Sequence, residues 1–311
     1  MIMRYHEPVL LNESINGLNI IPNGIYVDVT FGGGGHSREI LGRLNKGKLF
    51  AFDQDTDANK NNIKKDNFKL LNSNFRNIKN FLRIEGVNKI DGLIADLGVS
   101  SHQFNVADRG FSTRLSGNLD MRMNMNTKLN AQYIINNYLE EELANILFQY
   151  GELRNSRKIA KTIVMARKDK EIRTTDQLAD ILGKLSTQRK KNQFISRVFQ
   201  AIRIHVNDEI NALKEMLSAT VKLLKEGGRL SIISYHSLED RLVKNIIKKG
   251  NTEGFLEKDF YGNPQKPFKE ITKKVIIPSF DVEGQLNYFV TRKIDEDKRF
   301  KYINAKADKK K

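Results

Sequence analysis

The sequence predicts an α/β fold in which a mostly parallel sheet carries an inserted all-helical domain. Strand and helix signals alternate through the first hundred residues, a pattern typical of parallel strands joined by helical crossovers. A glycine-rich turn, Thr30–Ser37, follows the first predicted strand. After residue 95 the next convincing strand begins only at residue 229, a separation much longer than a normal crossover.

The first part of the chain contains four short runs that are rich in β-branched or apolar residues, which favours strands. Helical segments fall between them, so we expect right-handed crossovers. The predicted strands cover residues 25–31, 48–52, 68–71 and 92–95, and the predicted helices cover 37–44, 56–65 and 78–83.

The fifth predicted strand, residues 229–234, follows an amphipathic helix predicted over 208–225. We expect Gly227 and Gly228 to end that helix. Its apolar face is formed by Ile210, Leu213, Leu217 and Leu224. This helix and strand return the chain to the sheet after the long interruption.

The interruption predicts an inserted domain. We expect residues 1–103 and 207–311 to form the sheet domain and residues 104–206 to form the helical one. The predicted helices of the insert cover 139–150, 156–167, 176–185 and 194–206, and Thr174 and Gln177 form a capping-box pattern before the third. Beyond Leu242 the signal weakens; residues 272–277 and 286–293 are interpreted as a closing hairpin of the sheet, and 306–311 as a disordered basic tail.

The 311 residues carry a net charge of +16 and a pI near 9.7, which favours a polyanionic partner such as nucleic acid over a merely solvated lysine surface. Cysteine is absent, which excludes disulfides, thiolate zinc sites and cysteine nucleophiles. No apolar run is long enough for a membrane span and no secretory signal is visible, so we expect a cytoplasmic protein without membrane contact. The insert is rich in basic residues, which predicts an RNA clamp: Arg154, Arg157, Lys158, Lys161, Arg167, Lys168, Lys170, Arg189, Lys190, Lys191, Arg197 and Arg203.

The glycines of the turn after the first strand allow close approach of a ligand to the backbone and to a helix N-terminus. Asp53, at the end of the second strand, is placed to accept hydrogen bonds from ribose hydroxyls. Asp55 is expected to be angled away from the ribose that Asp53 would bind. Phe75, after the third strand, faces a purine in one interpretation, but spacing alone favours a core position. NAD and S-adenosylmethionine both satisfy this layout.

Asp96 ends the fourth strand, at the sheet edge where ligands bind in open α/β folds. A carboxylate there can accept a hydrogen bond from a reacting amine, and Asp120 is the alternative carboxylate. Tyr235 and His236 follow the fifth strand and are candidates for stacking on, or bonding to, a base turned out of its stack. The alternative, equally weighted, is that His236 caps the next helix and that Glu239 and Arg241 form a structural ion pair. No metal-binding constellation is predicted.

The chain closely resembles the bacterial 16S rRNA (cytosine-N4)-methyltransferase family, RsmH or MraW, over roughly residues 5–242. The segments that carry the resemblance are 6–11, 27–37, 91–101 with Gln103, 109–112 through 120–123, and 199–204 through 231–241. Two departures stand out: Tyr235 lies where phenylalanine is usual, and the C-terminal arginine- and serine-rich segment of the family is not evident.

The resemblance implies a class I Rossmann-like methyltransferase domain with an inserted helical substrate domain, acting with S-adenosylmethionine on a decoding-centre cytosine. It implies cofactor contacts at Gly34, Gly35 and His36, a ribose contact at Asp53, and a pocket completed by Phe75, Asp96 and Gln103. It therefore moves Phe75 from core to adenine contact. The absence of cysteine agrees with direct transfer to N4 and argues against C5 chemistry, which usually needs a cysteine adduct.

Two other functions remain as alternatives from the sequence. One is an NAD-dependent Rossmann oxidoreductase that uses the same glycine turn and Asp53, although it leaves the basic insert unexplained. The other is a non-catalytic ribosome-assembly RNA-binding protein. We expect the partner to be 16S rRNA within an assembled small subunit, and the oligomeric state, monomer or homodimer, is left open.

Overall fold

The computed structural model describes residues 8–269, 274–280, 286–293 and 301–306. The chain divides into two compact units, Met1–Ser231 and Ile232–Lys311. The first contains the large sheet and the helical segment, and the second contains one helix, a long loop and a small sheet. Across the described residues, no helix combines the length and apolarity that a bilayer span requires.

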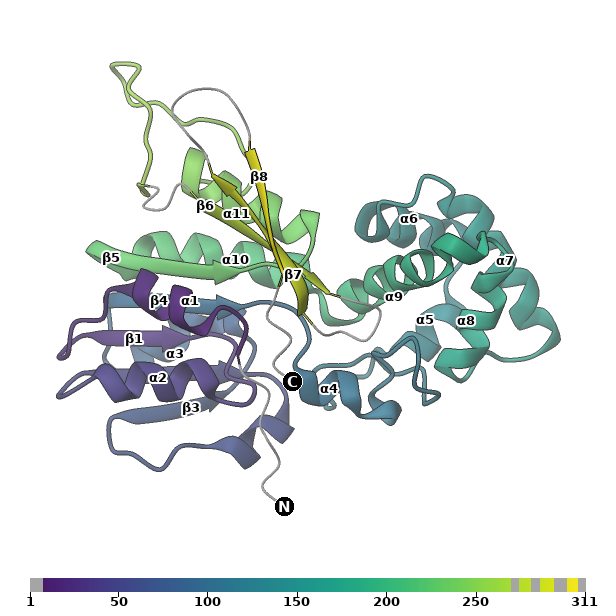
Figure 1. Ribbon diagram of the computed structural model, residues 1–311, viewed down its shortest axis with the longest axis horizontal. Helices are drawn as coiled ribbons and strands as arrows, with labels where there is room; N and C mark the ends of the chain where they lie inside the picture. Colours follow the sequence, from purple (N-terminus) through teal and green to yellow (C-terminus); the bar gives the residue numbers. More distant parts are fainter. Residues whose placement is uncertain (1–7, 270–273, 281–285, 294–300, 307–311) are drawn as a thin grey trace. The chain divides into compact units, whose positions relative to one another are not determined.

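The large sheet has five strands in the order β3-β2-β1-β4-β5 (Figure 1). The strands are β1 Ile25–Asp28, β2 Lys48–Asp53, β3 Phe68–Asn72, β4 Ile90–Asp96 and β5 Leu224–Ile233. β1 pairs in parallel with both β2 and β4, and β2 pairs in parallel with β3. This is a doubly wound order that reverses between β1 and β4, which confirms the predicted Rossmann-like α/β fold.

Helices cover both faces of this sheet (Figure 1). α1 Leu11–Leu18 contacts α2 Gly35–Arg43, whereas α3 Ile78–Ile84 contacts α10 Glu209–Leu223. Because both faces are covered, the central strands are buried almost continuously: in β4, Leu93, Ile94 and Ala95 are all 0% exposed. The carboxyl ends of the strands are left as the edge at which loops can form a site.

Two expected helices differ from the structure. Of residues 56–65, expected as an α-helix, only Thr56–Asn61 are helical, and they form the short 3₁₀ helix η1. The Asp55 side chain caps this helix by accepting the Asp57 N–H. The helix expected over 208–225 ends at Leu223, and Gly227 and Gly228 lie inside β5. Gly227 has a left-handed φ of 75°, and a Cβ on Gly228 would lie 2.9 Å from the Lys225 carbonyl, so these glycines serve the strand.

The helical segment has its own hydrophobic core, in which every buried member lies between Phe111 and Val206. The four predicted helices are confirmed as α6 Glu140–Gly151, α7 Ser156–Asp169, α8 Thr175–Gly183 and α9 Lys191–Asn207. At the predicted capping box before α8, the Gln177 Oε1 accepts the Thr174 N–H at 3.3 Å. Two further helices, α4 Ser101–Asn105 and α5 Ala131–Asn137, were not expected, and Ser100 caps the first of them. The domain boundaries themselves stay a prediction.

The second unit begins with α11 Ser237–Lys249. Its three strands, β6 Lys274–Phe280, β7 Leu286–Lys293 and β8 Lys301–Lys306, form an antiparallel sheet in the order β6-β7-β8. The expected hairpin therefore exists, but the expectation that it closes the large sheet was wrong, because β7 pairs with β6 on one side and with β8 on the other. Lys306 ends β8, and the rest of the expected tail lies outside the described residues.

The close contact between Gly92 and Tyr26 yields a stability prediction. A Cβ on Gly92 would lie 2.7 Å from the ring of Tyr26, which is 1% exposed and cannot move aside. We expect Gly92→Ala to lower the free energy of unfolding by about 1–3 kcal/mol. Gly42→Ala in α2, where nothing lies within 4 Å, is the control and should stabilise by a few tenths of a kcal/mol, up to about 1. Urea unfolding measures both, and equal effects would contradict the contact.

Candidate functional site

The glycine turn after β1 is shaped for close approach to the backbone. Gly34 has a φ of 75° and precedes α2 as its N-cap. A Cβ on Gly34 would lie 2.8 Å from the ring of Phe31, and one on Gly35 would collide with Pro8. Only glycine fits these positions, and the first N–H groups of α2 are left directed toward the carboxyl edge of the sheet.

A buried polar group lies beneath this turn. Asp28, at the end of β1, is 1% exposed and accepts hydrogen bonds from the Ser37 hydroxyl (2.7 Å) and the Thr30 N–H (3.0 Å). Burial raises its pKa, and the neighbouring His36 opposes that rise. His36 is 6% exposed, and its Nε2 has no hydrogen-bond partner among the described residues. Sequence analysis missed Asp28, although a carboxylate at the end of a buried strand before the glycines is a visible signal.

Asp53 is held against the glycine turn. One carboxylate oxygen accepts the Gly32 N–H at 2.7 Å, and the other accepts the Asp55 N–H at 2.9 Å. Burial raises the pKa of Asp53 to about 6, although these two hydrogen bonds act in the opposite direction. The predicted ribose-binding carboxylate thus lies next to the predicted ligand-binding turn, and backbone N–H donors set its orientation.

Gln103 belongs to a buried network that sequence analysis did not find. Its Nε2 donates to Asp55 (2.7 Å), and its Oε1 accepts the Ser100 N–H (3.2 Å). Arg109, 6% exposed, pairs with the same Asp55 oxygen at 2.8 Å and donates to the carbonyls of Arg122 (3.0 Å) and Met123 (3.1 Å). Asp55 therefore faces this network, and no local pattern in the sequence marks Arg109 as its partner.

The two candidate carboxylates differ in their surroundings. Asp96 ends β4, is half-buried, and its N–H donates to the Thr30 hydroxyl at 2.7 Å. Asp120, 9% exposed, accepts two hydrogen bonds from the Arg122 guanidinium, at 2.8 and 2.7 Å. These hydrogen bonds from Arg122 to Asp120 raise the pKa of Arg122 and compensate the charge of Asp120. Asp120 is therefore paired within its own loop, whereas Asp96 lies at the carboxyl end of a sheet strand.

A hollow of about 230 Å³ opens near the carboxyl ends of β2 and β3. Its lining includes Gln54, which follows Asp53, and Asn74 and Arg76, which flank Phe75. Phe75 itself is half-buried in η2 Phe75–Asn77, which has no buried residue. The other lining residues, Asn124, Thr127, Val206, Asn207 and Asp208, come from the loop after Met123 and from the α9–α10 junction.

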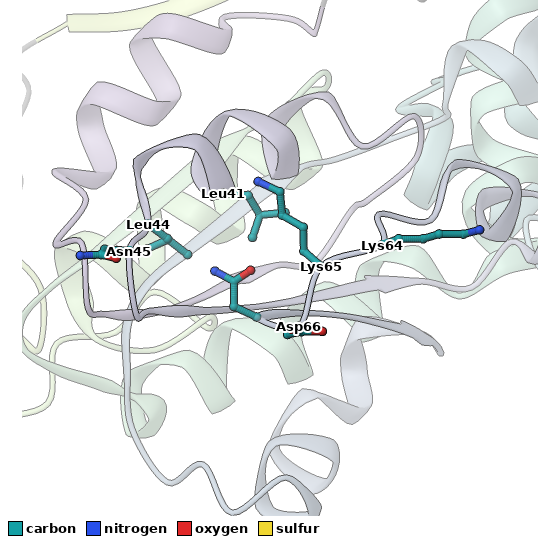
Figure 2. Close-up of a pocket in the computed structure, with 7 residues that line it drawn as sticks. Leu41, Leu44, Asn45, Lys64, Lys65 and Asp66 are labelled. Atoms are coloured by element: carbon teal, nitrogen blue, oxygen red, sulfur yellow. The ribbon is translucent and has the colours of Figure 1, made fainter.

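A larger hollow of about 520 Å³ lies elsewhere (Figure 2). Its lining comes from the end of α2, such as Leu41 and Leu44, and from the residues that precede β3, such as Lys64, Lys65 and Asp66. These residues lead into the amino ends of β2 and β3, opposite to the carboxyl edge. The larger hollow is therefore not part of the candidate site.

Tyr235 and His236 lie in the second unit, at the start of α11. The His236 side chain caps this helix by accepting the Glu239 N–H (3.4 Å), and its Nε2 lies 3.3 Å from the Glu239 carboxylate. The Tyr235 N–H donates to the same carboxylate at 2.8 Å, and the Tyr235 side chain is 36% exposed. His236 thus has the capping role that was one of its two predicted interpretations.

The basic residues of the helical segment fall into two groups. Several are structural: Arg167 donates to the carbonyls of Ile135 and Tyr138, Arg197 to those of Gly151 and Glu152, and Arg203 pairs with Glu209. Others on and beside α7 are exposed and have no partner among the described residues: Arg154, Arg157, Lys158, Lys161 and Lys168. These side chains are available to a polyanion, and so are Lys170, Arg189 and Lys190, which are likewise exposed.

Comparison with known proteins identifies the family. A model described as the MraW methylase family matches residues 3–288. The chain belongs to the MraW methylase family. Two similar family members are each called ribosomal RNA small subunit methyltransferase H: one from Christiangramia forsetii, 56% identical over 92% of this chain and 95% of its own, and one from Flavobacterium johnsoniae, 54% identical over 92% and 94%.

Among solved structures, an rRNA methylase from Streptococcus thermophilus is 25% identical over 32% of this chain and 57% of its own, with a TM-score of 0.24. A likeness of that extent carries no argument, so membership of the MraW methylase family rests on the sequences. Membership of this family makes the chain a methyltransferase.

The raised pKa of Asp53 predicts a pH-dependent stability. A carboxyl whose folded pKa is about 6, against an ordinary 3.8, stabilises the fold below pH 4 and loses that contribution as pH rises through 6. We expect a loss of about 1–2 kcal/mol between pH 4 and 7, less than the ~3 kcal/mol that two pKa units represent, because the side chain is partly exposed. Asp53→Asn should lack this component when its urea unfolding is compared with wild type at each pH. Parallel pH curves would contradict the raised pKa.

Proposed function

We propose that this methyltransferase transfers a methyl group from S-adenosylmethionine to the exocyclic N4 of a decoding-centre cytosine in 16S rRNA. The observation that carries the proposal is the similarity, over about nine-tenths of the chain, to relatives called ribosomal RNA small subunit methyltransferase H. We place the reaction in the cytoplasm, on an assembled small subunit. The geometry of the carboxyl edge of the sheet supports the choice of cofactor and of the acceptor carboxylate.

The residues around the glycine turn fit S-adenosylmethionine. Gly34 and Gly35 let a ligand approach the α2 N-terminus, and the buried His36 Nε2 offers a polar atom without a partner among the described residues. Asp53 would accept the ribose hydroxyls, Phe75 would lie against the adenine, and Asp96 and Gln103 would complete the pocket. When bound, the sulfonium supplies an electrophilic methyl group, and no cysteine nucleophile is needed.

The acceptor amine needs help from the protein. The N4 lone pair of cytosine is delocalised into the ring, so the amine is a poor nucleophile. A carboxylate that accepts an N4–H hydrogen bond favours the attacking geometry and stabilises the positive charge that develops. We assign this role to Asp96, whose backbone is fixed by Thr30. Asp120 is less suited because both of its oxygens are engaged by Arg122.

The substrate contacts follow from exposure and charge. The free cations on and beside α7 would contact rRNA phosphates, which is a sequence-independent and salt-dependent interaction. Tyr235, which is partly exposed, is assigned to stacking on the target base, and His236 supports it by capping α11. No observation favours the oxidoreductase or the non-catalytic assembly protein over this function.

The deciding experiment is methyl transfer from labelled S-adenosylmethionine to small ribosomal subunits that lack their native modification, followed by nucleoside analysis. We expect label in N4-methylcytidine. Label in another nucleoside would overturn the target atom. Absence of transfer despite cofactor binding would favour the binding-only alternative, whereas selective binding of NAD would favour the oxidoreductase.

Substitutions at Asp53 and at Asp96 should have different effects, the first on cofactor binding and the second on turnover. Asp53→Ala removes charged hydrogen bonds to the ribose and should weaken S-adenosylmethionine binding by roughly 1–3 kcal/mol. Asp96→Asn keeps the size of the side chain and should lower kcat more than it lowers cofactor affinity. Calorimetry and initial rates measure the two effects, and wild-type turnover in Asp96→Asn would remove Asp96 from the mechanism.

The α7 cations should determine the salt dependence of rRNA binding. We expect the triple charge reversal Arg157→Glu, Lys158→Glu and Lys161→Glu to weaken binding and flatten the plot of log affinity against log salt. Reversal of Lys64 and Lys65, beside the larger hollow, is the control and should change the slope little. Equal slopes for wild type and the α7 variant would mean that this face is only solvated.

A further inference from the structure

Two aromatic side chains stand at the tip of a short hairpin in the second unit. Phe260 is 96% exposed and Tyr261 is 85% exposed, the highest values among the large hydrophobic side chains of the described residues. Their ring centroids are 5.5 Å apart and the rings meet edge to face at 87°. The hairpin belongs to the long loop that extends beyond α11 (Figure 1). Within the described part of this unit, neither ring is buried against another element.

Hydrogen bonds hold this tip in one conformation. The Asp259 N–H donates to the Asn263 carbonyl (2.9 Å), and the Gln265 N–H donates to the Glu257 carbonyl (2.8 Å). The Asp259 carboxylate accepts the N–H groups of Tyr261 (2.9 Å) and Asn263 (2.8 Å). Gly262, with a φ of 86°, supplies the left-handed residue that ends a three-residue hairpin loop. A partner that contacts the rings therefore pays little conformational entropy for ordering them.

The size of the tip favours a nucleic acid over a protein partner. Two aromatic rings can bury roughly 300–500 Å², whereas a stable protein interface needs about 800 Å² on each side. A base, in contrast, stacks fully on a single ring, and each stack contributes independently of a larger interface. Charge points the same way, because Lys258, Lys266 and Lys269 are exposed and have no ion-pair partner among the described residues.

We propose that Phe260 and Tyr261 form a stacking platform, the aromatic tip, for unpaired bases of the RNA substrate. This proposal rests on the proposed function in that the substrate is ribosomal RNA. The aromatic tip supplies contact by stacking, and the flanking lysines attract the phosphates of the same strand. Binding through the tip is independent of the transferred methyl group.

The chain has no tryptophan, which allows a direct test. Tyr261→Trp keeps a stacking ring at the tip and makes it the sole indole of the protein. We expect its fluorescence to be quenched when the full-length protein is titrated with deproteinised 16S rRNA. Ile84→Trp, at a position 74% exposed on α3, is the matched control and should be quenched little. Equal quenching at both positions, or none at the tip, would overturn the proposal.

Removal of the rings should weaken binding without changing its salt dependence. We expect Phe260→Ala with Tyr261→Ala to bind 16S rRNA roughly tenfold or more weakly at every salt concentration, with an unchanged salt slope. Phe260→Tyr with Tyr261→Phe keeps both rings and should bind like wild type, whereas leucine at both positions should not. Thermal unfolding and cofactor binding should stay at wild-type values, because both side chains are exposed.

The outcomes separate this inference from the proposed function. If wild type methylates rRNA and the double alanine variant binds it equally well, the aromatic tip is not a stacking platform. A loss seen only with protein-containing subunits, or a change in self-association, would assign the tip to a protein partner and overturn the proposal. Failure of wild type to methylate any rRNA would instead count against the proposed function, whatever the fluorescence result.

Discussion

The loops at the carboxyl edge of the sheet depend on one buried cation, Arg109. A guanidinium that is 6% exposed is strongly destabilising unless its charge and donors are compensated. Asp55, Asp57 and the carbonyls of Arg122 and Met123 compensate its charge and its two terminal nitrogens, whereas its Nε has no hydrogen-bond partner among the described residues. Since these groups follow β2 or belong to the loop before α5, a single side chain fastens segments that are distant in the sequence. The small hollow is lined by residues of the same two segments, Gln54 after β2 and Asn124 and Thr127 in the loop before α5.

The same network sets the orientation of the proposed cofactor contacts. Asp55 accepts from Gln103 through its side chain and donates to Asp53 through its N–H, so one residue positions both. The loop that Arg109 anchors is itself tight: Met121 has a left-handed φ of 62°, costly for a residue with a side chain. Its N–H donates to the Arg109 carbonyl and its own carbonyl accepts from Asn207. These bonds keep a strained backbone in place at the edge where the substrate is proposed to bind.

The proposed RNA contacts divide between two kinds of interaction. The α7 cations act through charge, an interaction that is long-ranged, strongest at low salt and independent of the RNA sequence. The aromatic tip acts through stacking, which is short-ranged and insensitive to salt. Each belongs to a different compact unit, so each contribution is separable by mutation. A basic net charge of +16 alone does not reveal this division, because it counts buried, paired and free cations alike.

Local patterns in the sequence were enough for the α/β fold, the strand order of appearance, the long helices α6–α9 and the position of Asp53 at a strand end, because strand and helix periodicity and glycine turns are local properties. They were not enough for the Arg109 network, the buried Asp28 or the structural use of Arg167 and Arg197, since these depend on partners far along the chain. The end of α10 and the pairing of the C-terminal strands were predicted wrongly for the same reason: tertiary packing decides which backbone groups form hydrogen bonds with one another. What the sequence by itself determined is therefore the family, the fold and the candidate residues, whereas only the tertiary structure decided which charges are compensated and which remain free to bind.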